Sequence, residues 1–130
     1  MNYDHLRELK HELRTPVNHI LGYSELLLET ADDFGDQTVA VLARGIRARG
    51  QLLARLLEAT LLSQVGEVND KRNELRSSVG PVIQDILAVS CSPPEMSGLV
   101  SYEQDLERIR VAAHKLMRLV SGTEVRAAGG

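Results

Sequence analysis

Apolar residues recur at steps of three and four along most of this sequence, and that period constrains the fold more than any other feature. A stripe with this spacing is typical of an amphipathic helix that buries one face. No segment shows the alternation of apolar and polar residues that predicts a half-buried strand. The longest stripe lies between residues 4 and 31 and consists of Leu6, Leu9, Leu13, Val17, Ile20, Ser24, Leu27 and Ala31.

The same spacing continues between clusters of turn-forming residues and predicts four helices in all. The expected helices cover residues 4–31, 37–65, 71–89 and 101–121. The apolar seams predicted for the later three are Val39, Leu42, Ile46, Leu53, Leu56, Leu57 and Thr60; then Leu75, Val79, Val82, Ile83, Ile86 and Leu87; then Leu106, Ile109, Ala113, Leu116 and Val120. Four helices with short connections favour an all-α fold, an antiparallel four-helix bundle made of two helical hairpins.

The connections and caps follow from residue types. Turns are expected at residues 32–36, 66–70 and 90–94. Asp36 is a predicted cap for the second helix, and Ser101 with Gln104 forms a predicted capping box for the fourth. The chain therefore divides into a first hairpin at residues 1–66, a second at 67–122 and a tail at 123–130 that we expect to be mobile.

Two kinds of residue should disturb these helices. Pro16 lacks an N–H and crowds the carbonyl of Glu12, so we expect the first helix to bend there. Gly45 and Gly50 should each weaken the second helix by about 1 kcal/mol relative to alanine.

An internal repeat relates the two hairpins. His11–Val17 aligns with Asn73–Val79, with Glu, Leu, Arg and Val identical and Thr15 opposite the similar Ser77. Further along, Arg55-Leu56 aligns with Arg118-Leu119 at an offset one residue longer. Amphipathic helices can resemble one another through periodicity alone, but the matches include surface residues that periodicity does not require. We interpret the repeat as a tandem duplication in which two similar hairpins pack about a pseudo-twofold axis.

Composition excludes several classes of function. The formal net charge is −3, which gives no electrostatic reason for a nucleic acid or an anionic membrane as partner. No apolar run approaches the ~20 residues of a membrane-spanning helix, and the N-terminus is not of the secretory kind. The single cysteine, Cys91, cannot form an internal disulfide, which is compatible with the cytoplasmic location that we predict.

The segment His11-Glu12-Leu13-Arg14-Thr15-Pro16-Val17 carries the chemistry. It strongly resembles the H-box of sensor histidine kinases, in the dimerisation and histidine-phosphotransfer domain of the HisKA type. The resemblance continues through the second helix and covers about residues 4–66. It implies that His11 accepts a phosphoryl group, and that the position of Thr15 helps to place a water that dephosphorylates a receiver partner.

The residues themselves support this interpretation. His11 is about 200° around the helix from Leu13, so it should face water when Leu13 faces the core. An exposed imidazole is largely neutral at pH 7, and neutral imidazole is the nucleophile that attacks phosphorus. Adjacent Glu12 could take the proton from the other ring nitrogen.

Further residues should support the reaction on the same face. Arg14 could contact phosphate oxygens, although a solvated role is an open alternative. Asn18 continues the face with a small side chain, and Pro16 supplies the expected bend. His5, His19 and His114 are expected to be surface or packing residues. An H-E-x-x-H metal site is excluded, because Thr15 stands where its second histidine would be.

The departures from the family pattern limit what the chain does alone. Asn73 stands where the second repeat would need its histidine, and no ATP-binding half is present. We therefore expect no cofactor in this chain, with ATP and Mg²⁺ supplied by partner domains. The expected partners are a histidine kinase ATPase domain and a response-regulator receiver domain, and the chain itself is expected to be a monomeric pseudo-dimer. The alternatives are a non-catalytic signal-relay bundle with a relic H-box and a receiver phosphatase.

Overall fold

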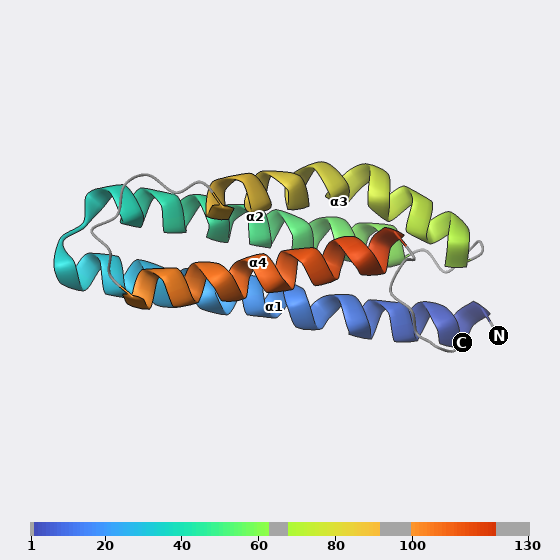
Figure 1. Cartoon of the computed structure of the whole chain (residues 1–130). Coiled ribbons are helices and arrows are strands. Elements are labelled where there is room, and N and C mark those ends of the chain that lie inside the picture. The colour runs from blue at the N-terminus through green and yellow to red at the C-terminus, as the bar shows by residue number, and fades with distance from the viewer. Residues whose placement is uncertain (1, 63–67, 92–99, 122–130) are drawn as a thin grey trace.

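Four long helices account for the described part of the chain (Figure 1). The computed structural model describes residues 2–62, 68–91 and 100–121, with side chains for 7–60, 73–90 and 102–121. The helices are α1 (Asn2–Phe34), α2 (Gln37–Leu62), α3 (Val68–Cys91) and α4 (Val100–Ser121). No strand occurs within the described ranges, so the prediction of an all-α four-helix bundle is confirmed.

The helices pack side by side in the order in which they follow one another along the chain. α1 packs against α2 and α4, and α3 packs against the same two helices from the opposite corner. α4 therefore closes the bundle by returning to α1, which places the second hairpin against the first. Among the described residues, no helix is long and apolar enough to cross a membrane.

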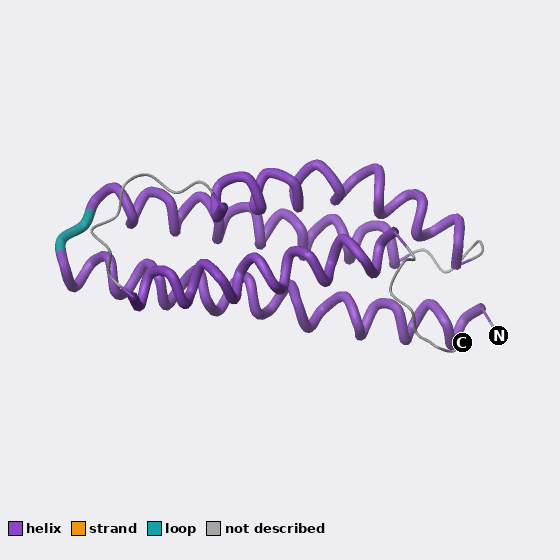
Figure 2. Tube along the Cα trace, viewed as in Figure 1, coloured by secondary structure: helices purple, strands orange, loops and turns teal. Residues whose placement is uncertain are grey.

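The short connection between α1 and α2 is set by Gly35 and Asp36 (Figure 2). Gly35 has φ 68°, and its N–H bonds the carbonyl of Asp32 while the N–H of Asp36 bonds that of Ala31. This is the Schellman arrangement that ends a helix at a left-handed glycine. The carboxylate of Asp36 then accepts a hydrogen bond from the N–H of Val39 at 3.2 Å, which confirms the predicted cap.

Helices extend into several segments that the sequence predicted as turns. α1 continues through Phe34, α3 begins at Val68 and α3 continues through Cys91, so the turn predictions at those positions are wrong. The Ser90 hydroxyl donates to the carbonyl of Ile86 at 2.7 Å inside the helix, which satisfies this buried polar group. The predicted end of the second helix at Val65 and the tail at 123–130 lie outside the described residues, as does the side chain of Ser101.

The core consists mainly of the residues that the periodicity predicted. Leu13, Ile20 and Ile46 are fully buried, as are Leu75 and Ile83 in the second hairpin. The predicted core residues that prove only partly buried are Leu42, Leu56, Thr60, Val82 and Leu87, while the side chain of Leu6 is outside the described range. These partly buried positions lie at the edges of their helical stripes, where neighbouring helices cover only one side.

Gly50 marks a close approach between α1 and α2. A Cβ atom at this position would lie 2.9 Å from Leu21 Cδ2 and 3.3 Å from Ile20 Cγ2. The residue is buried, so its missing side chain lets the two helices pack closely. The sequence predicted only the propensity cost of this glycine, because its packing role depends on the neighbouring helix.

Candidate phospho-acceptor site

His11 lies in the first half of α1 with its side chain exposed. Leu13 and Val17 point into the core from the neighbouring positions. Thr15 and Asn18, one and two turns further on, are exposed like His11 and extend the same face. The predicted exposure of His11 is thus confirmed, whereas its chemical role stays a prediction.

Two other predicted site residues are less accessible. Glu12 is partly buried, and Pro16 is buried within an α1 that continues without interruption from Asn2 to Phe34. The bend expected at Pro16 stays a prediction. α3 carries an internal proline of its own, Pro81, and it too continues as a helix past this residue.

Arg14 and Lys10 both reach across to α2, where they contact one carboxylate. Arg14 donates to Glu58 Oε2 at 2.8 Å, and Lys10 Nζ lies 3.4 Å from Glu58 Oε1. The hydrogen bond from Arg14, assisted by Lys10, holds the pKa of the Glu58 carboxyl below its usual value. A groove of about 350 Å³ adjoins these charges and is also lined by Val17, Asn18, Ala54 and Leu57. Arg14 was predicted to contact phosphate oxygens, with a solvated role as the alternative, and its contact with Glu58 could not be predicted because the pairing depends on the register of α1 against α2.

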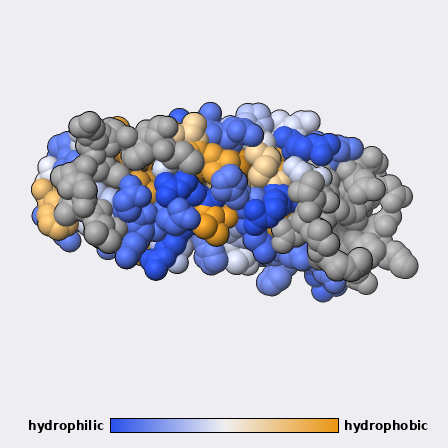
Figure 3. Space-filling view, viewed as in Figure 1, coloured by the Kyte–Doolittle hydropathy of each residue, from blue (hydrophilic) through white to orange (hydrophobic). Residues whose placement is uncertain are grey.

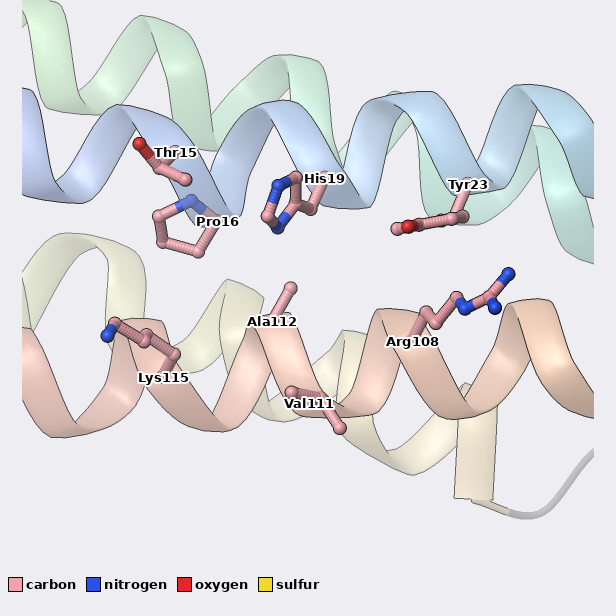
Figure 4. Close-up of a pocket in the computed structure, with 8 residues that line it drawn as sticks. All are labelled: Thr15, Pro16, His19, Tyr23, Arg108, Val111, Ala112 and Lys115. Atoms are coloured by element: carbon pink, nitrogen blue, oxygen red, sulfur yellow. The ribbon is translucent and has the colours of Figure 1, made fainter.

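A second groove, of about 370 Å³, lies between α1 and α4 (Figure 4). From α1 it is lined by Thr15, Pro16, His19 and Tyr23, and from α4 by Arg108, Val111, Ala112 and Lys115. None of these eight side chains is acidic. The groove begins at Thr15, one turn along α1 from His11, so it continues the face on which the histidine lies.

Three of these side chains form a stacked cluster at one end of the groove. The rings of His19 and Tyr23 meet edge to face with centroids 6.1 Å apart, and the guanidinium of Arg108 lies 5.4 Å from the centre of the Tyr23 ring. Val111 is 55% exposed at the rim. The bundle face in Figure 3 likewise shows hydrophobic surface gathered near its middle, between hydrophilic side chains. His19 was predicted to be a surface or packing residue, and its spacing of four from Thr15 is the signal that could have placed it beside the site.

The aligned face of the second hairpin is built differently. Asn73 is exposed on α3, as His11 is on α1. Arg76, which aligns with Arg14, donates to Asn73 Oδ1 at 2.6 Å within its own helix. The arginine of the first hairpin is therefore drawn to α2, whereas that of the second contacts the residue that aligns with His11.

Two histidines remain from the sequence predictions, His5 and His114. His114 is exposed on α4, and the side chain of His5 lies outside the described range. Within the ranges that the structure describes, no three histidine, cysteine or acidic side chains gather where they could hold a metal ion.

A helical hairpin with an exposed histidine on its first helix is the arrangement of a phospho-acceptor module. Residues 1–66 match the His Kinase A (phospho-acceptor) domain, and the match covers just over half of the chain. The chain therefore belongs to the HisKA family, whose domain carries the phospho-acceptor histidine of two-component signalling. No curated protein and no solved structure matches the sequence.

Proposed function

We propose that His11 is the phospho-acceptor of this chain and that the module passes a phosphoryl group between a kinase ATPase domain and a receiver-domain aspartate. The observation that carries the proposal is the exposure of His11 on α1 at the first position of the H-E-L-R-T-P segment, within the family match. His19 is exposed on the same helix but does not begin such a segment. His114, by comparison, is exposed on α4, outside the matched residues.

The reaction follows from the nucleophile. A neutral ring nitrogen of His11 attacks phosphorus, an N–P bond forms, and the bond to the leaving oxygen of the donor breaks. Glu12 accepts the proton from the other ring nitrogen, which offsets the positive charge that develops on the ring. In the onward step a receiver carboxylate attacks phosphorus and the N–P bond breaks. ATP and Mg²⁺ arrive with the partner domains.

The groove between α1 and α4 supports the proposal of a receiver partner. It combines an apolar floor at Pro16 and Ala112 with cationic side chains from Arg108 and Lys115, and none of its lining residues is acidic. An acidic surface around a receiver aspartate would meet complementary charge there. His11 and Thr15 would then lie at the edge of the contact.

The second hairpin supports the proposal of a tandem duplication. α3 and α4 occupy the places against α1 and α2 that a second hairpin of the same kind would take in a symmetric dimer. Intramolecular pairing avoids an association cost of about 4 kcal/mol or more. The chain would thus be a monomeric pseudo-dimer with one reactive face. Light scattering should give a mass near 14.3 kDa at every dilution, and a mass near twice that value throughout would overturn this arrangement.

One experiment separates phosphotransfer from the two alternatives. The protein is incubated with a phosphorylated receiver domain, and the His11→Ala and Thr15→Ala variants are measured in parallel. Transfer to the bundle that depends on His11 supports the proposal. Loss of receiver phosphate that depends on Thr15 and not on His11 indicates a phosphatase. Equal behaviour of all three proteins indicates a relay bundle with a relic H-box.

A further inference from the structure

Glu58 lies beside the proposed phospho-acceptor without belonging to the H-box. Its two carboxylate oxygens contact different cations, Arg14 at 2.8 Å and Lys10 at 3.4 Å. Lys10 directly precedes His11, and Arg14 lies one turn beyond it. A single carboxylate on α2 therefore contacts both of these cationic neighbours of the histidine, which lie on the side of α1 that faces α2.

The second hairpin offers a comparison in which the position on α4 that aligns with Glu58 has no carboxylate. The offset that aligns Arg55 with Arg118 places Ser121 opposite Glu58, so the aligned position carries no charge. There Arg76 folds back along its own helix and donates to Asn73 at 2.6 Å, three residues before it. Asn73 is the position that corresponds to His11.

We propose that Glu58 is a positioning residue that holds Arg14 against α2 and keeps its guanidinium away from His11. The inference rests on the proposed function of His11 and deepens it. Without Glu58, Arg14 would take the path that Arg76 takes and would contact the group at position 11.

The consequence concerns the lifetime of the phosphorylated state. A guanidinium bound to a phosphoryl group forms short, charge-assisted and often bidentate hydrogen bonds. Those bonds would stabilise phosphohistidine in its ground state and slow the departure of the phosphoryl group. By holding Arg14 on α2, Glu58 keeps the phosphohistidine labile, as a group that must be passed on requires.

The lifetime can be measured without a cognate partner. Phosphoramidate serves as donor: its P–N bond breaks, ammonia leaves, and the N–P bond to the imidazole forms. Hydrolysis to inorganic phosphate is then followed by ³¹P NMR after the donor is removed. We expect the Glu58→Gln variant to lose its phosphohistidine about three to ten times more slowly than the unaltered chain.

Two variants separate positioning from a general effect on the bundle. Glu58→Gln combined with Arg14→Gln should return the half-life to that of the unaltered chain, because no guanidinium is left to move. Asp85→Asn is the matched control, since it also removes one ion pair between helices, with Arg49 at 3.9 Å between α2 and α3. Its half-life should equal that of the unaltered chain. A slowing that persists in the double variant, or that appears in Asp85→Asn, overturns the proposal.

A second measurement tests, independently of phosphorylation, whether Glu58 positions Arg14. Proton NMR of Glu58→Gln should show a nuclear Overhauser contact between the Arg14 side chain and the His11 ring that the unaltered chain lacks. Its absence overturns the positioning role even if the half-life changes. If neither the unaltered chain nor any variant takes up phosphate on His11, the proposed function fails. The contact between Arg14 and His11 in Glu58→Gln still tests the role of Glu58 in that case. If Glu58→Gln does not fold, Ser121→Glu supplies the reverse test, because it should draw Arg76 away from Asn73, and an unmoved Arg76 contradicts the proposal.

Discussion

The α1–α2 hairpin carries His11 on an exposed face, whereas the α3–α4 hairpin carries Asn73 at the aligned position. Both hairpins bury the aligned leucines, Leu13 and Leu75, completely. They differ in their charges, since Arg14 contacts Glu58 on α2, whereas among the described residues Arg76 bonds to Asn73 of its own helix. The comparison teaches that two hairpins can share a buried packing stripe while the polar residues on their exposed faces differ.

The largest expected effect tests the difference between the two faces directly. His11→Asn copies the second hairpin into the first and should abolish uptake of acid-labile, base-stable phosphate, because an amide has no nucleophilic nitrogen at neutral pH. Mass mapping of the peptides checks the site. Phosphate that remains in this variant, on His5, His19 or His114, would contradict the assignment.

The aligned leucines test whether both hairpins contribute to one cooperative core. Leu13→Ala and Leu75→Ala each remove a fully buried side chain and should each lower the free energy of unfolding by about 2–5 kcal/mol. Urea denaturation followed by circular dichroism measures both. A Leu75→Ala variant as stable as the unaltered chain would show that the second hairpin is not part of the same core.

Two glycines, one in each hairpin, differ in how closely other atoms approach them. Gly50→Ala would put a Cβ 2.9 Å from Leu21 Cδ2 and 3.3 Å from Cγ2 of the buried Ile20. The overpacking cost, about 1–3 kcal/mol, should outweigh the helix propensity regained, about 1 kcal/mol, so the bundle should be destabilised. At Gly80, in the second hairpin, an added Cβ meets nothing within 4 Å, so Gly80→Ala should stabilise α3 by about 0.5–1 kcal/mol. Thermal unfolding of both variants checks the opposite signs, and equal shifts would refute the close approach.

Two carboxyl groups, one from each hairpin, should respond oppositely to pH. Burial raises the pKa of Asp105 above 3.8, an effect that nearby Arg108 partly offsets. The native state therefore binds this proton more tightly, and stability falls as the pH rises from about 3.8 through the folded pKa. Asp105→Asn should be more stable than the unaltered chain at neutral pH and should lose that advantage in acid.

Glu58 should show the reverse dependence. Because Arg14 lowers its pKa below 4.5, its stabilising effect is present above that pH and is lost as the pH falls through the folded pKa. Glu58→Gln should therefore differ from the unaltered chain only above that range. Chemical denaturation between pH 3 and pH 7 measures the free energy of unfolding of both variants and of the unaltered chain. If the two variants differed from the unaltered chain with the same pH dependence, the opposite pKa shifts of Asp105 and Glu58 would be contradicted.

The sequence predicted those features of the fold that depend on one helix at a time. The period of three and four placed Leu13, Ile20 and Ile83 in the core, and the residue type of Asp36 predicted its cap. The exposure of His11 followed from its angle to Leu13. Each of these depends on local geometry that a single sequence contains.

Features that depend on two helices at once could not be predicted. The contact of Glu58 with Arg14 and the approach of Gly50 to Leu21 both require the register of α1 against α2. The helix ends were misplaced where polar residues such as Ser90 bond back to their own helix and let it continue. The groove between α1 and α4 depends on how the two ends of the chain come together, which periodicity does not specify.

Tyr102 has a consequence for the order in which the bundle is assembled. Its ring is fully buried near the start of α4, and its hydroxyl donates to Asp36 at 3.4 Å, a partner 66 positions earlier in the chain. Such distant pairs form late, because closing a long loop costs entropy before any contact rewards it. During synthesis α1 and α2 emerge first and can fold against each other, while the side of α1 that bears His19 and Tyr23 waits for α4. The surface beside His11 is thus completed only when α4 has folded, so a nascent chain that ends before α4 does not yet present the groove that we propose for the receiver.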